Sequence, residues 1–312
     1  MDKYLNRLPG TAAVLIATVF WSLSPAMVKA VNIDAMLLPC LRAVIAGLLL
    51  LPFFKPRQLR FDWRLLLMAT AFSCISLFAV MAFRYTATAN ATALYFSSPL
   101  WVFIFTSIVA RKIKLGGIPS VLLLALGIFI ILLEPKSGSN QLGNIMGICA
   151  GVAFATFALS FDRVEHARRM NYLAACNLYA APFIALVILI SSPQLFAEVG
   201  GYDAGPWLML LLMAVTQQII PYYLYGIGLS KLPVFRVSML GLGEFVLSPV
   251  WTLILLRDIP TWYGFCGWLL IFAGLVLNLY LSFREEHGVN NYSSQQQAAG
   301  EENVRETIGS YR

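Results

Sequence analysis

Charged side chains are scarce in this chain of 312 residues. Only 12% of the residues are Asp, Glu, Lys or Arg, whereas 59% are hydrophobic. Soluble domains carry about 25% charged residues, so a water-soluble protein of this length could not bury so much apolar surface. The apolar residues form runs of about 18 to 25, the length an α-helix needs to cross the hydrocarbon core of a membrane. The composition therefore predicts an all-α integral membrane protein whose surroundings are the lipid bilayer.

Several motifs of catalysis and energy conversion are also missing. The sequence contains no GxxxxGK[ST] loop, which argues against an ATP-driven motor, and no HExxH pair. The five cysteines lie in apolar runs without a CxxC pair, as expected of small buried hydrophobic side chains. We therefore expect no metal, no cofactor and no enzymatic activity. An intramembrane enzyme and a non-transporting membrane scaffold remain the alternatives from other functional classes.

The basic residues are placed as in a membrane protein rather than a nucleic-acid-binding one. The net charge is +7, but Lys and Arg occur mainly in short loops between apolar runs, so we expect no nucleic-acid partner. With the N-terminus inside, fifteen of them fall in cytoplasmic segments and four in outer segments, in agreement with the positive-inside rule. This bias predicts an inner (plasma) membrane protein with both termini in the cytoplasm. The expected spans, about ten, are 10–29, 35–54, 63–83, 86–110, 117–134, 142–161, 172–192, 205–228, 234–256 and 261–282.

An internal repeat divides these spans into two halves. The segment 98–101, Ser-Pro-Leu-Trp, recurs at 248–251 as Ser-Pro-Val-Trp, and Gly127 in the following run recurs as Gly274. With five spans in each half, the second half enters the membrane from the opposite side, as in many secondary transporters. The sequence therefore predicts two inverted five-helix repeats.

The boundaries of these units follow from the composition. We expect residues 1–136 to form the first repeat and residues 137–284 to form the second. Residues 285–312 are polar, rich in Gln, Asn and Ser, and poor in apolar residues. Such a segment cannot bury enough apolar surface to fold, and we expect it to be a disordered cytoplasmic tail.

The order of short motifs resembles that of a known family. Phe20-Trp21 lies in the first span, Leu41-Arg42-Ala43 lies early in the second, and the Pro-centred fourth and ninth spans each precede a Gly-rich span. This pattern, over roughly residues 9 to 282, resembles the drug/metabolite transporter superfamily, in particular its EamA-type members. The sequence departs from it after the fourth span, where Arg111-Lys112 replaces an acidic residue carried by many members. The resemblance implies a secondary carrier of small metabolites, often an exporter.

Glu244 is interpreted as the only carboxylate well inside a span. A charge at this depth is costly, so its side chain must face a cavity or a partner. Helical spacing places Glu244, Ser248 and Trp251 on one face. One hypothesis is that Glu244 binds a proton or a cationic group at the membrane midplane. The alternatives are an ion pair with Arg42 or Arg84, or a protonated Glu bonded to a neighbouring helix.

Further side chains are candidates for a substrate pocket. Arg42 could bind a carboxylate in bidentate fashion, although it could also pair with Glu244 or extend to the membrane interface. The aromatic candidates could instead belong to interfacial belts, and the polar ones could join helices by hydrogen bonds. These candidates are Trp21, Tyr95, Trp101, Tyr222, Trp251, Asn90, Ser98, Gln217 and Ser248.

The sequence as a whole predicts a carrier that moves a small organic metabolite by alternating access. Our first expectation is export of an amino acid or a related amphipathic compound, with protons as one candidate for the coupling ion. The alternative is uptake or exchange of a cationic or nucleotide-type metabolite. The oligomeric state, the coupling ion and the direction of transport stay open at this point.

Overall fold

The structure is a computed structural model that describes residues 8–112, 115–134, 141–161, 163–165, 168–232, 234–281 and 284. Helices dominate the described residues, which contain no β-strand. The predicted tail, residues 285–312, lies outside the described residues. The prediction of an all-α membrane protein is confirmed.

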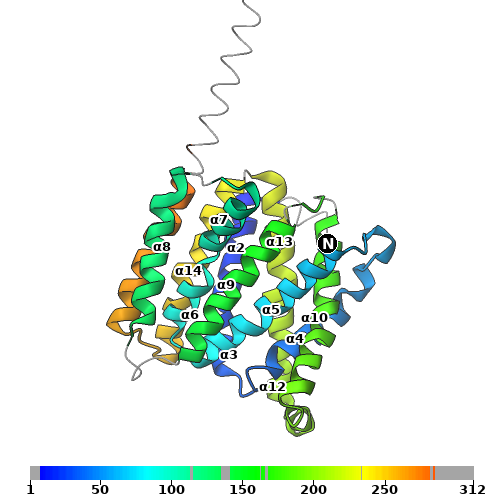
Figure 1. The fold of residues 1–312 in the computed structure, drawn as a ribbon. Coiled ribbons are helices and arrows are strands. Elements are labelled where there is room, and N and C mark those ends of the chain that lie inside the picture. Colours follow the sequence, from blue (N-terminus) through cyan, green and yellow to red (C-terminus); the bar gives the residue numbers. More distant parts are fainter. Residues whose placement is uncertain are drawn as a thin grey trace, which may run out of the picture.

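Within the described residues, seven helical segments are long and apolar enough to cross a membrane, and three further apolar helices are shorter. These ten correspond in order to the ten predicted spans (Figure 1). The first five are α2 with α3 (Gly10–Ser22, Ser24–Ala30), α4 (Leu37–Leu50), α5 (Trp63–Tyr85), α6 with α7 (Thr88–Tyr95, Ser98–Ala110) and α8 (Ile118–Leu132). The second five are α9 (Gln141–Phe161), α10 (Arg169–Ser191), α12 with η6 and α13 (Ala204–Met213, Ala214–Ile219, Ile220–Lys231), α14 (Val234–Leu256) and the tenth helix, Trp262–Leu281.

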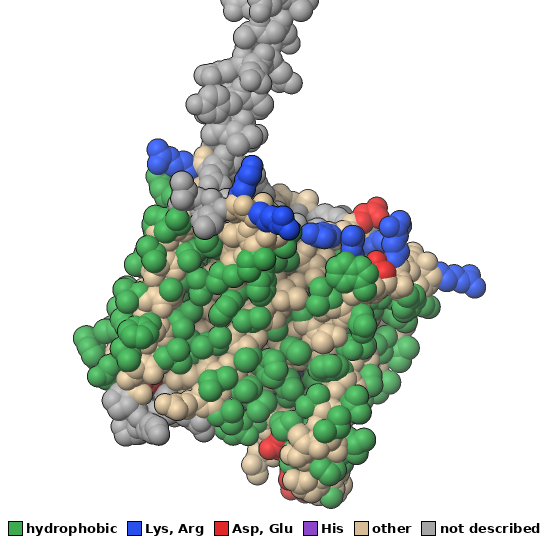
Figure 2. Space-filling view, in the orientation of Figure 1, with side chains coloured by type: hydrophobic (Ala, Val, Ile, Leu, Met, Phe, Trp, Pro, Cys, Tyr) green, Lys and Arg blue, Asp and Glu red, His purple; other side chains and the backbone are tan. Residues whose placement is uncertain are grey.

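The surface is arranged for a bilayer. Hydrophobic side chains cover the sides of the bundle, while Lys and Arg gather at the end where α7 and α13 finish (Figure 2). We call this the basic end, and the opposite end, where α3 finishes, the far end. Large apolar side chains such as Val109 and Ile190 are largely exposed on the sides. Exposed apolar surface on this scale is what contact with lipid chains requires.

Helix α8 of the first half crosses the tenth helix of the second half at glycine contacts. A Cβ atom on Gly127 would lie 2.6 Å from Ile271 Cγ1 and 2.8 Å from the Gly267 carbonyl oxygen. A Cβ atom on Gly274 would lie 3.1 Å from the Ser120 carbonyl oxygen. The same difference in residue number relates Gly127 to Gly274 and Ser120 to Gly267. The contact of Gly127 with the Gly267 carbonyl therefore has a counterpart in the contact of Gly274 with the Ser120 carbonyl, in which the two helices exchange roles. Reciprocal contacts of this kind are the mark of a two-fold relation, here between two halves of one chain.

The crossing leads to a test of packing. Gly127→Ala should lower the free energy of unfolding by about 1–3 kcal/mol, because the added methyl group overpacks the contact with the tenth helix. Gly226→Ala is the matched control, since a Cβ on this helical glycine meets open space, and alanine should be neutral there or stabilising by up to about 1 kcal/mol. Thermal unfolding in detergent compares the two variants. Equal midpoints for both would contradict the close crossing.

Candidate functional site

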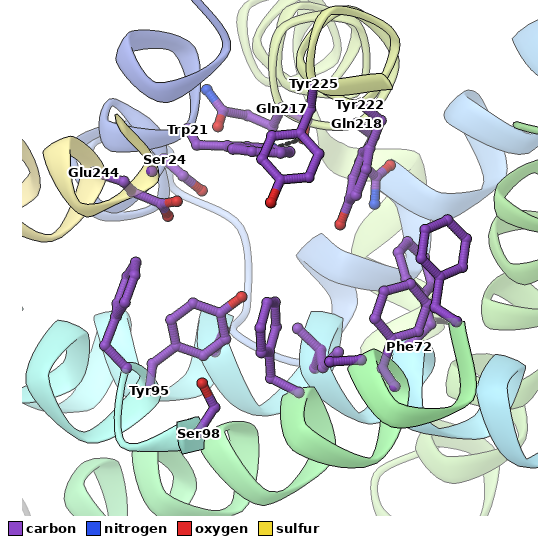
Figure 3. Close-up of a pocket in the computed structure, with 18 of the residues that line it drawn as sticks. Trp21, Ser24, Phe72, Tyr95, Ser98, Gln217, Gln218, Tyr222, Tyr225 and Glu244 are labelled. Atoms are coloured by element: carbon purple, nitrogen blue, oxygen red, sulfur yellow. Dashed lines mark hydrogen bonds between the residues drawn. The ribbon is translucent and has the colours of Figure 1, made fainter. Parts of the chain in front are cut away.

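A cavity of about 880 Å³ lies inside the bundle, lined by helices of both halves. Ser230, in the last turn of α13, lines the cavity and is exposed to solvent, so the cavity opens at the basic end. On the side towards the far end its lining includes buried Phe83 of α5. Seven of the eleven predicted site residues line it, most of them drawn in Figure 3: Trp21, Arg42, Tyr95, Ser98, Gln217, Tyr222 and Glu244.

A break between α6 and α7 turns two of these residues into the cavity. Pro99 has no N–H, so the carbonyl of Tyr95 cannot accept the bond that a continuous helix would supply. The chain instead makes a turn at Phe96 and Ser97, and α7 restarts with Pro99 in its first turn, a position that proline favours. Tyr95 and Ser98 flank this break, and both line the cavity (Figure 3).

Span eight is interrupted on the opposite wall. Residues 214–219 form a π-helix just before Pro221. Since Pro221 has no N–H to offer the carbonyl of Gln217, that carbonyl accepts a hydrogen bond from the Trp21 indole at 3.1 Å. The Trp21 ring packs edge-on against Tyr222 with centroids 5.1 Å apart, and it lies 5.4 Å from the Tyr225 ring. The sequence thereby builds an aromatic wall on spans one and eight.

The cavity carries one acidic and one basic side chain. The Glu244 carboxylate extends from α14 into the space (Figure 3), which Tyr95 and Tyr222 also line. Arg42 is only 7% exposed; its guanidinium donates a hydrogen bond to Ser76 Oγ at 3.1 Å, while its Nε has no partner. An uncharged cavity would not need these two groups, and their charges make it suited to polar or zwitterionic ligands.

The ion-pair interpretation of Glu244 is wrong for this conformation. In the described part of the chain, the two ion pairs are Lys29 with Asp258 and Arg168 with Glu165. Arg84 instead donates hydrogen bonds to the carbonyl oxygens of Val31 and Ile33, so its charge is satisfied by backbone.

Four predicted site residues lie outside the cavity lining, which corrects the expectation that Trp101 and Trp251 line one cavity. Each indole is fixed by a hydroxyl group: Trp101 donates to Ser97 Oγ at 3.2 Å, and Trp251 donates to Ser22 Oγ at 3.0 Å. Helix α14 continues through Pro249 rather than breaking before it as span four does at Pro99. The other two residues outside the lining are Ser248 and Asn90, both buried.

Sequence reasoning also missed several groups. Glu134, just beyond the C-terminal end of α8, is a buried carboxylate at the edge of the fifth span. The signal was available, because the acid ends the run Leu132-Leu133-Glu134 within the predicted fifth span. The missed lining residues include Phe72, Ser76, Phe154, Phe157 and Gln218; apart from Gln218, which stands next to a predicted site residue, nothing in their spacing separates them from core residues.

A polar clamp joins the two halves at the far end of the bundle. Asp258, after α14, accepts hydrogen bonds from Lys29 Nζ at 2.6 Å and from the backbone N–H of Thr88 at 2.8 Å. Helix α6 begins at Thr88 without a side-chain cap of its own, so the second half supplies the cap, a role that suits a carboxylate. Burial alone would raise the pKa of Asp258, but the bonds from Lys29 and Thr88 outweigh it and hold the pKa below its ordinary value.

Comparisons with known proteins agree with this architecture. A sequence profile of the EamA-like transporter family matches the chain twice, over residues 8–133 and 141–280. The chain is 24% identical over 238 residues to an uncharacterized transporter of Archaeoglobus fulgidus, covering 75% of this chain and 83% of that one. It is 27% identical over 234 residues to the threonine/homoserine exporter RhtA of Salmonella typhimurium strain SL1344, covering 71% and 74%. One solved crystal structure matches with a TM-score of 0.57 at 18% identity, covering 89% of this chain and 98% of that chain, which shows a shared fold.

The clamp predicts a pH dependence of stability. Since the pKa of Asp258 is lowered on folding from an ordinary value of 3.8, its contribution is fully present above that value and is lost as the pH falls through the lower, folded pKa. The wild type should therefore unfold at a higher temperature than Asp258→Asn at neutral pH, and the gap should close in acid. Asp203→Asn is the control, as Asp203 is exposed and caps nothing by its side chain. A gap that stays constant into acid would contradict the charged clamp.

Proposed function

Because the chain belongs to the EamA-like transporter family, we propose that it is a secondary carrier that exports an amino acid or a related amphipathic compound. The carrier works by alternating access: the two halves rock about the crossing of α8 with the tenth helix, and the cavity opens in turn at the basic end and at the far end. The protein lies in the inner membrane, and its basic end faces the cytoplasm, as the positive-inside rule favours. Both chain termini then lie on the cytoplasmic side.

The observation that carries this proposal is the cavity itself. It lies between the halves, it opens at the basic end through the exposed Ser230, and the clamp around Asp258 holds the halves together at the far end. A carrier in this state is ready to load substrate from the cytoplasm, which is the step an exporter needs. The 27% identity to a threonine/homoserine exporter supports the same direction and the same substrate class.

The charges in the cavity fit a zwitterion. The Arg42 guanidinium lines the cavity, its bond to Ser76 engages one of its five N–H donors, and bonds between guanidinium and carboxylate are strong and directional. Glu244 is free to receive a substrate ammonium group or a proton. The aromatic wall of Trp21, Tyr222 and Tyr225 offers ring faces to an apolar side chain and to a cation.

Glu244 also fits the coupling of export to protons. An ionised carboxylate without a counter-charge is costly in the membrane, and proton binding removes that cost. Substrate and proton can then occupy the site in alternation, so that an inward proton gradient drives export. The substrate ammonium and the proton compete for one carboxylate, which is the simplest arrangement for antiport.

A second candidate function follows from the same unpaired carboxylate. If Glu244 is a permanent ligand for positive charge, the protein is an uptake or exchange carrier for a cationic metabolite, and Arg42 plays only a structural part through its bond to Ser76. In that case Glu244→Gln should abolish substrate binding at every pH. Under proton-coupled export, the neutral side chain should instead keep exchange while losing the response to a pH gradient.

The experiment is flux in proteoliposomes with a panel of labelled amino acids that includes threonine and homoserine. For the wild type, an imposed pH gradient should accelerate movement of at least one of them. In Glu244→Gln the gradient should have no effect, while exchange across the bilayer persists. Glu198→Gln, at an exposed position outside the cavity, is the matched control and should behave as wild type.

Unchanged gradient-driven flux in Glu244→Gln would remove this residue from the mechanism. Failure of the wild type to move any amino acid would contradict the substrate class. Turnover of a compound by the protein in detergent, without a sealed bilayer, would contradict a carrier and favour an intramembrane enzyme.

A further inference from the structure

A second carboxylate lies inside the bundle, outside the cavity lining. Glu134, just beyond the C-terminal end of α8, is 6% exposed, and Asn90, in the first turn of α6, is fully buried at 0% exposure. Asn90 Nδ2 donates a hydrogen bond to Glu134 Oε2 at 2.6 Å. The pair therefore joins the fourth and fifth spans near the far end.

Two oxygens of this pair are left without donors. Neither Glu134 Oε1 nor Asn90 Oδ1 has a hydrogen-bond partner. The other two polar atoms of the pair, Asn90 Nδ2 and Glu134 Oε2, are bonded to one another. A buried polar atom without a partner costs free energy, and an ionised buried carboxylate with a single hydrogen bond costs far more. The pair is thus incomplete as an ionised carboxylate and a neutral amide.

The charged groups nearby do not complete it. At this end of the bundle, Lys29 and Asp258 are bonded to one another, and Arg84 donates to two backbone carbonyls. Asp34 accepts from the backbone N–H of Met36, and Arg257 is exposed. Within the described residues, none of these groups forms an ion pair with Glu134.

One proton supplies what is missing. A neutral carboxylic acid has one O–H donor and one carbonyl acceptor, and a primary amide has the complementary N–H donor and carbonyl acceptor. The acid and the amide can then be joined by two hydrogen bonds, Nδ2–H to Oε2 and Oε1–H to Oδ1, which leaves neither oxygen unpaired. We propose that Glu134 and Asn90 form a proton-binding site, separate from the central cavity, that is occupied when the far end of the bundle is closed.

The site lies where the two halves meet. A Cβ atom on Gly264 of the tenth helix would lie 2.3 Å from Asn90 Oδ1, so the second half covers the amide directly. Thr88, two residues before Asn90, is held by Asp258 of the second half. Any motion that parts the second half from α6 therefore uncovers the pair. A ligand that binds only one state stabilises that state, so protonation of Glu134 from the far side favours closure there.

The proton itself is the observable that tests the site. Infrared difference spectra of the purified, lipid-reconstituted wild type, recorded as the pH is raised, should show loss of a carboxylic-acid carbonyl band that belongs to Glu134. Glu134→Gln should lack that band. It should keep the wild-type unfolding temperature, because an amide can also form two hydrogen bonds with Asn90. Glu244→Gln should retain the Glu134 band, which separates this site from the cavity carboxylate and makes the result independent of the transport assay.

Asn90→Ala provides a second readout that leaves the acid in place. Without Asn90 Oδ1 the O–H of Glu134 loses its acceptor, so the band should shift to the frequency of a less strongly bonded acid. The proposal is overturned if the spectrum of Glu134→Gln retains every band of the wild type, or if Asn90→Ala leaves the band unmoved. A fall in the unfolding temperature of Glu134→Gln that is as large as that of Glu134→Ala would also overturn it, because it would show that the charge is what the fold needs.

Discussion

Polar groups in the hydrocarbon region must find a partner or reach a water-filled space, because the bilayer offers them neither donors nor acceptors. Three spans of the described chain depart from a regular helix, and each departure lies on the cavity. The first is at Leu23 between α2 and α3, the second at Phe96 and Ser97, and the third in the π-helix 214–219. Residues beside each of them line the cavity. Irregular backbone is therefore confined to the place where a membrane protein can tolerate it, which is also where half-helices can present polar groups to a substrate.

The interruption between α6 and α7 depends on a small residue in the neighbouring helix. A Cβ atom on Gly151 of α9 would lie 2.7 Å from Ser97 Oγ and 2.9 Å from the Leu94 carbonyl, so the broken end of α6 rests directly on the glycine. Close glycine contacts also join the two halves, at Gly127 and Gly267. Helices in lipid associate through close packing rather than through the hydrophobic effect. In this protein glycine contacts both support the cavity wall and join the two halves.

Much of the fold could be predicted from the sequence because the constraint that produces it is local. Apolar runs of the right length have to be spans, and a repeated Ser-Pro-x-Trp segment has to be a repeated unit. The polar and aromatic residues around Pro99 and Pro221 could be placed in a cavity because proline frees a carbonyl and breaks a span. The repeat does not extend to the backbone at Pro249, where the helix continues, and the predicted pocket residue Trp251 donates to Ser22 Oγ instead of lining the cavity.

The sites that the sequence does not reveal depend on partners far along the chain. Glu134 is bonded to Asn90, and Asp258 caps a helix that begins 170 residues earlier. Which way a side chain such as Trp101 points depends on the rotation of its helix and on the hydroxyl within reach of its N–H. Neither the rotation of a helix nor the position of a hydroxyl partner can be read from hydropathy and spacing, because the packing of the whole chain determines both.

The central claim is that substrate passes through the cavity between the halves, and counterflow tests it most directly. Proteoliposomes preloaded with unlabelled substrate should concentrate labelled substrate when they contain the wild type. Gly226 lines the cavity and a side chain there starts in open space, so Gly226→Trp should fold, fill the cavity and abolish counterflow. Gly201→Trp, at an exposed glycine outside the cavity that also has open space, should leave counterflow intact. Wild-type counterflow in a folded Gly226→Trp protein would contradict the account.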